Sequence, residues 1–379
     1  MEEVVDEAAS SKILKLAASQ LKEEEEEGMG GGSEMKYEIE EDSDEEQFSE
    51  TEEEYDMQYT YESNTRLSEA DERALAMFMS NQPAQRQTLA DVLKEKMDMK
   101  EDQTEEEVGE QVRRGIKPEV VQVYVSVGKI LKTYTCGKLP KAFKILPVLQ
   151  NWEEIMYITN PHEWSPCAIY QGTKIFSSNL NAAMAQRFYS LVLLPKVRED
   201  IGENKRLNYH LYQALKKALY KPAAFFKGIM LPLCEEACTH KEAIIIASVI
   251  AKVSIPWTHS AAALMRVAQM DYNGASSIFM KCIINKKYAL PYSVVDSVVQ
   301  HFLTFIDEDR MLPVLWHQCL YCFCQRYKTS LTKAQKEQLK PVLRKHNHAQ
   351  LTPLIRNELY TSLCRDDEKG ATPAERESA

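Results

Sequence analysis

The sequence predicts an all-α protein: an irregular HEAT-like α-solenoid of antiparallel helices, preceded by a long disordered acidic N-terminal tail. From Pro118 onward, apolar residues recur with helical spacing, and proline lies near most helix starts. The alternation of apolar and polar residues that is typical of strands is almost missing. The connections between predicted helices are only a few residues long, which favours antiparallel neighbours. These three observations set the fold class.

The helical body is predicted to span residues 116–365, and several features justify its helices in order. Pro195 should kink or split the helix that contains it, because proline lacks an N–H group and clashes with the preceding turn. Capping boxes are expected where Thr239 precedes Glu242 and Thr332 precedes Gln335. No repeat of fixed length is present, so a compact helical bundle is the alternative to a solenoid. The predicted helices cover residues 119–135, 140–150, 152–159, 166–178, 182–203, 205–220, 222–234, 241–253, 256–270, 273–286, 291–305, 312–327, 333–345 and 353–364.

The first 115 residues differ from the body in charge. Residues 1–110 contain 35 Asp or Glu and 10 Lys or Arg, a net charge of −25, whereas the rest of the chain carries +14. Such an acidic segment buries too little apolar surface to offset its chain entropy, so residues 1–115 and the C-terminal residues 366–379 are expected to be disordered. Glutamate lies three residues after each of three candidate phosphorylation sites: Ser43, Ser49 and Thr51.

Two short amphipathic segments interrupt the acidic tail, near residues 71–80 and 88–97. The second begins with a weak capping box in which Thr88 precedes Asp91 by three residues. These segments are expected to dock, either on a partner or on the body of the same chain. Helices that form only transiently in solvent are the alternative.

Several functional classes are disfavoured. The nine cysteines show no disulfide framework and the N-terminus lacks an apolar signal region, so a reducing compartment is expected. The longest apolar run, residues 243–251, is far shorter than the roughly 20 residues of a membrane span, so no membrane insertion is expected. On one helix, His317, Cys319, Cys322 and Cys324 point in too many directions to share a metal ion.

Motifs for nucleotide binding and catalysis are missing as well. Val127, Gly128 and Lys129 lack the upstream glycine and the following Ser or Thr of a phosphate-binding loop. Kinase, dinucleotide-binding and hydrolase motifs are not found. We therefore expect a non-enzymatic binding protein with no metal and no cofactor, and not an obligate homo-oligomer.

A basic segment provides the candidate binding site. Residues 174–233 contain ten Lys or Arg, three Asp or Glu and eight aromatic residues, although the whole chain has a net charge of −11. A basic surface with interleaved aromatic rings indicates a polyanionic partner. The alternative is that these side chains only solvate a core helix. Helical spacing over 205–220 puts one set on a shared outer face: Lys205, Arg206, Tyr209, Tyr212, Gln213, Lys216, Lys217 and Tyr220.

The primary candidates for contacting the phosphates of such a polyanion extend beyond that helix. They are Arg187, Lys196, Arg198, Lys205, Arg206, Tyr209, Lys216, Lys217, Tyr220, Lys221 and Lys227. Secondary basic candidates are Lys138, Lys141, Lys144, Lys286 and Lys287. The two exposed tyrosines, Tyr209 and Tyr220, are expected to stack on a base or on a partner's arginine.

Long stretches of this chain resemble the bystin family of eukaryotic ribosome-assembly factors. The resemblance is carried by DERALAMFM at 71–79, TLADVLKEKM at 88–97, GKLPKAFKILPVLQNWEEI at 137–155, MAQRFYSLVLLPKVRED at 184–200, KRLNYHLYQALKKALYKPAAFFKGIMLPLCE at 205–235, DYNGASSIF at 271–279, KKYALPYSVVD at 286–296 and LPVLWHQCL at 312–320. The resemblance implies a non-enzymatic factor that binds pre-18S rRNA within the pre-40S particle. It also implies small-subunit ribosomal proteins and other assembly factors as partners, and a nuclear and nucleolar location with shuttling to the cytoplasm.

The chain departs from the family pattern at its beginning. Bystins usually carry a Lys/Arg-rich arm before the acidic region, whereas this chain opens with MEEVVDEAAS. Either the arm is lost or the sequence is incomplete, and the way in which nuclear import works without the arm stays open.

Two interpretations of the function stay open. In the first, the basic surface clasps folded rRNA, and the acidic tail either engages basic ribosomal proteins or screens that surface against indiscriminate RNA. In the second, the same helical solenoid is a protein scaffold or adaptor in adhesion or trafficking, with no direct RNA contact.

Overall fold

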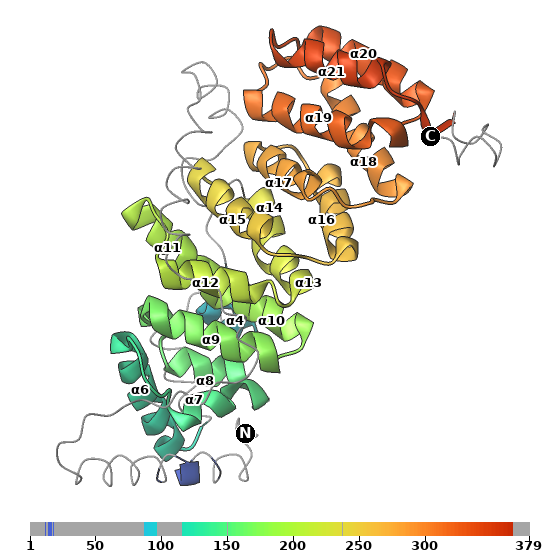
Figure 1. Cartoon of the computed structure of the whole chain (residues 1–379). Coiled ribbons are helices and arrows are strands. Elements are labelled where there is room, and N and C mark those ends of the chain that lie inside the picture. Colours follow the sequence, from blue (N-terminus) through green and yellow to red (C-terminus); the bar gives the residue numbers. More distant parts are fainter. Residues whose placement is uncertain are drawn as a thin grey trace, which may run out of the picture.

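The computed structural model describes residues 12, 14–16, 18, 87–96, 116–149, 151–236 and 238–366. Every regular element among these residues is a helix, and no strand occurs among them (Figure 1). The all-α prediction is confirmed. The predicted helix at 71–80, the three candidate phosphorylation sites and the tails outside the described ranges lie beyond what the structure describes.

The N-terminal part of the body follows the predicted boundaries closely. Ser165 caps one helix by accepting a hydrogen bond from the Ala168 amide at 3.1 Å. Proline begins three of the elements, where its missing N–H has no intrahelical partner to lose. The elements are α4 (Leu89–Lys96), α6 (Pro118–Thr133), α7 (Lys141–Ile145), the 3₁₀ turn η1 (Leu146–Val148), α8 (Trp152–Ile158), the 3₁₀ turn η2 (Pro161–Glu163) and α9 (Pro166–Asn179).

The central part contains two π-helical turns, and each ends two residues before a proline. The predicted kink at Pro195 takes the form of a wider turn, which moves the preceding carbonyl away from the proline ring. Pro232 follows the second turn in the same way. The elements are α10 (Ala182–Phe188), the π turn η3 (Tyr189–Leu193), α11 (Leu194–Asn204), α12 (Tyr209–Ala218), α13 (Pro222–Phe225), the π turn η4 (Phe226–Met230) and α14 (Leu231–Glu235).

The C-terminal part confirms both predicted capping boxes. The Thr239 hydroxyl oxygen accepts from the Glu242 amide at 3.4 Å, and Thr332 accepts from Gln335 at 3.2 Å. The elements are α15 (His240–Lys252), α16 (Trp257–Gln269), α17 (Gly274–Asn285), α18 (Tyr292–Leu303), the 3₁₀ turn η5 (Thr304–Ile306), α19 (Val314–Tyr327), the 3₁₀ turn η6 (Lys328–Ser330), α20 (Lys333–Lys345) and α21 (Leu351–Tyr360).

The helices stack in two layers along the molecule. In the first layer, α12 packs between α9 and α15, then α15 packs on α17, α17 on α19, and α19 on α21. In the second layer, α14 packs on α16, α16 on α18, and α18 on α20. Figure 1 shows α9, α12, α15, α17, α19 and α21 following one another along the molecule. Stacking of alternate helices is the arrangement expected of an irregular α-solenoid.

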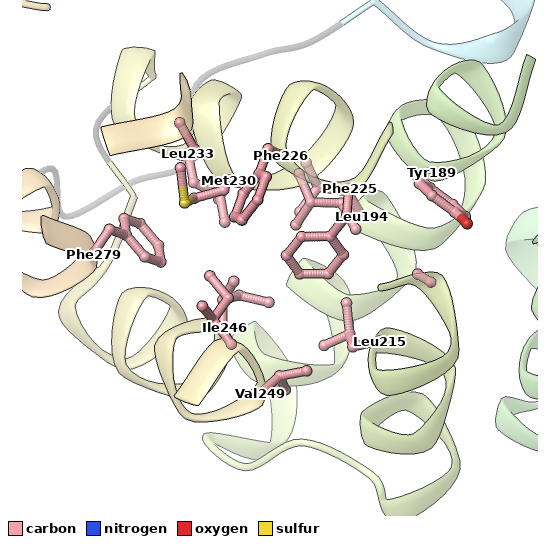
Figure 2. Packing of buried hydrophobic residues seen from close by; sticks show 14 of the residues in the cluster. Tyr189, Leu194, Leu215, Phe225, Phe226, Met230, Leu233, Ile246, Val249 and Phe279 are labelled. Atoms are coloured by element: carbon pink, nitrogen blue, oxygen red, sulfur yellow. The ribbon is translucent and has the colours of Figure 1, made fainter. Parts of the chain in front are cut away.

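The core runs between the two layers. Leu215 from α12 and Ile246 from α15 point into the same interior as Phe225, Met230 and Phe279 (Figure 2). Gly228 permits a close approach there, because a Cβ at that position would lie 2.8 Å from the Gln186 carbonyl oxygen. This continuous core fixes which face of each first-layer helix is left for solvent.

The short helix α4 docks on the body through α8. Leu93 is fully buried, and Lys96 lies 3.3 Å from Glu153 and 4.0 Å from Glu154, two buried carboxylates at the start of α8. Burial raises the pKa of Glu154, and the charge of Lys96 opposes that shift. The segment at 88–97 was expected to dock on a partner or on the body of its own chain. In the structure it docks on the body of its own chain.

Candidate nucleic-acid interface

The start of α12 is set by a cap that the sequence analysis did not place. Lys205 ends α11 in the left-handed conformation, with φ of 56°. Asn208 then caps α12 by accepting from the His210 amide at 2.9 Å, and its own amide donates to Asp200 at 2.7 Å. The predicted helix start at 205 is therefore wrong, and Lys205 and Arg206 lie in the connection between α11 and α12.

The exposed face of α12 is narrower than predicted. Tyr212 is only 5% exposed, and its hydroxyl lies 3.5 Å from the Ser248 hydroxyl of α15. The prediction that Tyr212 faces outward is wrong, because α12 is flanked by α9 and α15 and both neighbours cover part of its circumference. Helical periodicity in a sequence identifies the face of a helix that packs on the core. It does not show how many neighbouring helices cover the two sides of that helix.

Two tyrosines and two lysines form the outward stripe of α12. Tyr209 is 47% exposed and Tyr220, just past the end of α12, is 67% exposed. Lys217 lies over the Tyr220 ring at 5.5 Å, and Lys216 lies over the Tyr212 ring at 5.8 Å. Exposed rings beside amines can stack on bases while the amines contact phosphates.

Arg198 is also a predicted site residue, but its charge is used inside the protein. Its Nε donates to Glu242 at 3.0 Å and its Nη1 donates to Glu236 at 3.0 Å, and the side chain is 9% exposed. Glu242 accepts from the Thr239 amide as well, so one guanidinium group connects α11 to the capping box of α15 and to the end of α14. Arg198 is a structural residue here.

Three further primary candidates have internal partners. Arg187 Nε lies 2.7 Å from Glu153, and Lys196 donates to Glu199 and to the His162 carbonyl, both at 2.8 Å. Lys221 donates to the Leu180 carbonyl at the end of α9, and desolvation lowers its pKa. In the described residues no carboxylate pairs with Arg206, Lys217 or Lys227. Lys205 donates to the Gly202 carbonyl in the last turn of α11.

The secondary candidates also include both a lysine with internal partners and lysines that are exposed. Lys286 donates to the Val253 carbonyl at 2.5 Å and to the Ala251 carbonyl at 3.2 Å, which caps the end of α15, and desolvation lowers its pKa. Lys287 is exposed, with φ of 59°. The remaining three, Lys138, Lys141 and Lys144, lie in or just before α7 and away from the α12 stripe in sequence; two are exposed, and Lys141 is half-buried.

The first layer has a charge pattern that the sequence analysis missed. Helices α9, α12, α17 and α19 contain no Asp or Glu, and the single acidic residue of α15 is the buried, paired Glu242. Exposed cations on these helices, outside the predicted set, are Lys174, Lys241, Lys252 and Arg326. Counting carboxylates helix by helix would have found this pattern. Carboxylates flank it on α11, which carries Glu199, Asp200 and Glu203, and on α21, where Glu358 pairs with Lys328.

The cysteines of α19 are structural. Cys319 and Cys324 are buried, and desolvation raises the pKa of both thiols, so they stay protonated at neutral pH. Within the described ranges, no three His, Cys, Asp or Glu side chains are grouped so that they could hold a metal ion. No helix in that part of the chain combines the length and the apolar character of a bilayer span.

Comparison with known proteins agrees with the resemblance. The Bystin family profile matches residues 83–369. Bystin from Nematostella vectensis is 55% identical over 311 residues, covering 82% of this chain and 72% of that protein. Bystin from Homo sapiens is 54% identical over 302 residues, covering 79% of this chain and 69% of that protein. The chain therefore belongs to the bystin family.

Proposed function

We propose that this protein is a non-enzymatic ribosome-assembly factor that binds pre-18S rRNA within the pre-40S particle. Family membership supports this proposal. The observation that carries it is the α12 surface, which we define as Lys205, Arg206, Tyr209, Lys216, Lys217 and Tyr220. It joins two exposed cations, Lys205 and Arg206, and two half-buried lysines, Lys216 and Lys217, to two exposed tyrosine rings on a chain whose net charge is −11. Lys227 is exposed too, but it lies on η4, which packs on α13 and α14.

The chemistry of this surface suits a nucleic-acid backbone. Lysine and arginine side chains neutralise phosphates and release condensed counterions, which makes the affinity depend on salt. Tyr209 and Tyr220 add ring faces for unpaired bases. Arg187, Lys196 and Arg198 do not belong to the proposed interface, because carboxylates of the same chain pair with them. Lys221 is excluded because its half-buried amine donates to the Leu180 carbonyl, whereas Lys205 donates to a carbonyl but stays exposed.

The rest of the proposal follows from the family. Small-subunit ribosomal proteins and other assembly factors are the proposed co-ligands, and the protein acts in the nucleus and nucleolus before it shuttles to the cytoplasm with the particle. We also propose that the protein is required for 18S rRNA processing and for maturation and export of the small subunit.

A charge reversal on α12 tests the proposal. The variant R206E/K216E/K217E should reduce the affinity for an 18S-derived RNA fragment at least tenfold at about 100 mM salt, because each phosphate contact adds to the salt-dependent term. A matched variant, R266E/K333E/R344E, reverses three exposed cations on α16 and α20 of the second layer and should bind as the parent does. Equal affinity of all three proteins would exclude α12 as an RNA site.

A protein scaffold is the second candidate, and one observation favours it. Trp257 and Tyr292, the first residues of α16 and α18, are 49% and 50% exposed. Exposed aromatic side chains are enriched at protein interfaces. Protein capture that survives the α12 reversal and is lost in W257A/Y292A would support this function for the second layer.

A further inference from the structure

We infer that the RNA interface is wider than α12 and that the outer face of α9, α12, α15, α17 and α19 forms one track for an RNA double helix. This inference rests on the proposed function and specifies its ligand. The outer face is the side of these five helices turned away from the core in Figure 2 and from the second layer. In Figure 1 the five helices follow one another from the middle of the molecule toward its C-terminal end.

Each of the five helices contributes a cation to this face. Lys174 on α9, Lys241 and Lys252 on α15, and Arg326 on α19 are exposed, and in the described residues no carboxylate pairs with any of them. Lys174, Lys241 and Lys252 lie opposite the buried faces of α9 and α15, and Arg326 lies at one side of α19 near its C-terminal end. Lysine stems can extend from such positions to a phosphate while their methylene groups stay on the helix surface.

Helix α17, the fourth of the five, also keeps its charge, although its lysine has a partner. Lys281 on α17 donates to the Gln318 side-chain oxygen of α19 at 2.7 Å. A neutral amide orients the ammonium group without cancelling its charge, so α17 adds to the positive potential of the face. The sequence of α17 holds no carboxylate that could oppose it.

Contacts across the helix boundaries make the face continuous. Tyr212 of α12 meets Ser248 of α15, with 3.5 Å between the hydroxyl oxygens. Cys282 of α17 donates to the Ala247 carbonyl of α15 at 3.1 Å. The hydrogen bond from Lys281 to Gln318 connects α17 to α19. The five helices therefore present one packed surface on which the cations have fixed relative positions.

The spread of charge favours a duplex over a single strand. Packed helices lie about 8–10 Å apart, so five in a row distribute cations over roughly 35–40 Å. Domains that bind double-stranded RNA by shape contact a similarly extended stretch, about 16 base pairs, through phosphates and 2′-hydroxyls. Single-strand sites instead need a series of stacking rings, whereas the two exposed rings here, Tyr209 and Tyr220, both belong to α12 and its end.

Charge reversal away from α12 tests this inference. The full chain carrying K241E/K252E/R326E should bind a 20-base-pair RNA duplex at least tenfold more weakly at about 100 mM salt, measured by fluorescence anisotropy. The slope of log affinity against log salt should fall by about 2 to 3 in magnitude, near one unit for each lost phosphate contact. The second-layer variant R266E/K333E/R344E has the same net charge and should bind the duplex as the parent does. Thermal unfolding of all variants checks that they are folded.

The outcomes separate this inference from the proposed function. If R206E/K216E/K217E weakens duplex binding and K241E/K252E/R326E does not, the interface ends at α12, and the wider track is overturned while the proposed function stands. If neither variant weakens RNA binding, the proposed function fails as well. An equal loss of affinity for the single strand and the duplex would overturn the duplex as the ligand. A loss confined to the duplex supports the track.

Discussion

Arg198 on α11 and Lys217 on α12 lie in the same basic stretch of sequence, yet the fold gives them opposite roles. Arg198 is buried between Glu236 and Glu242, whereas Lys217 points outward beside an exposed tyrosine. The difference comes from their neighbours: Arg198 of α11 reaches Glu236 at the end of α14 and Glu242 at the start of α15, while no carboxylate among the described residues pairs with Lys217. A cation that pairs with a buried carboxylate connects helices of the same protein. A cation with no carboxylate partner can instead bind a ligand.

Removing the buried charge should have the largest effect on stability. Arg198→Met leaves Glu236 and Glu242 without their partner and should lower the free energy of unfolding by about 3–5 kcal/mol, as expected when one member of a buried ion pair is lost. Urea denaturation measures this change. Lys217→Ala is the matched control and should change stability by less than about 0.5 kcal/mol. Equal stabilities for the two variants would contradict the division into structural and exposed cations.

His301 on α18 provides a third case, a buried ionisable group with no carboxylate partner in the structure. Its Nδ1 lies 3.2 Å from the Ala268 carbonyl, the rings of Tyr272 and Phe305 flank it, and Asp271 lines the same pocket. Burial lowers the pKa of His301 to about 4, so the folded protein favours the neutral ring. Its contribution to stability is complete above about pH 6.5 and is lost as the pH falls toward 4.

The expected size of that loss is about 3 kcal/mol, from the difference between the folded and unfolded pKa values. Urea denaturation at pH 7 and pH 4.5 should show it as a steeper acid destabilisation of the parent than of His301→Gln, which cannot titrate. Parallel pH profiles for the two proteins would show that His301 is not held neutral by burial.

The smallest expected effect is a change in nonspecific RNA affinity when the acidic tail is deleted. If the tail screens the basic surface, deletion of residues 1–65 should strengthen nonspecific RNA binding by a few-fold at low salt, with little change at high salt where charges are screened. Anisotropy with a mixed-sequence RNA measures this. Unchanged affinity at low salt would remove the screening role and leave basic ribosomal proteins as the proposed target of the tail.

Local sequence rules predicted most of the helices of this protein. Prolines at helix starts, the capping boxes at Thr239 and Thr332 and the short connections gave boundaries that the structure reproduces within a few residues over most of the body. Pro195 was expected to disturb its helix, and a π turn accommodates it. Two predictions about α12 were wrong. Its start was misplaced because Lys205 and Arg206 fit the outward stripe whether or not they are helical, and Tyr212 is buried because α9 and α15 cover the sides of the helix.

The sequence by itself determined the fold class, the family and the location of excess positive charge, because these depend on spacing and composition along the chain. Only the tertiary structure decided which cations are displayed, because pairing depends on carboxylates from distant segments: Glu242 reaches Arg198 across 44 positions, and Glu153 reaches Arg187 from α8. It also brought five helices with almost no carboxylates into one layer, an arrangement set by packing against a shared core.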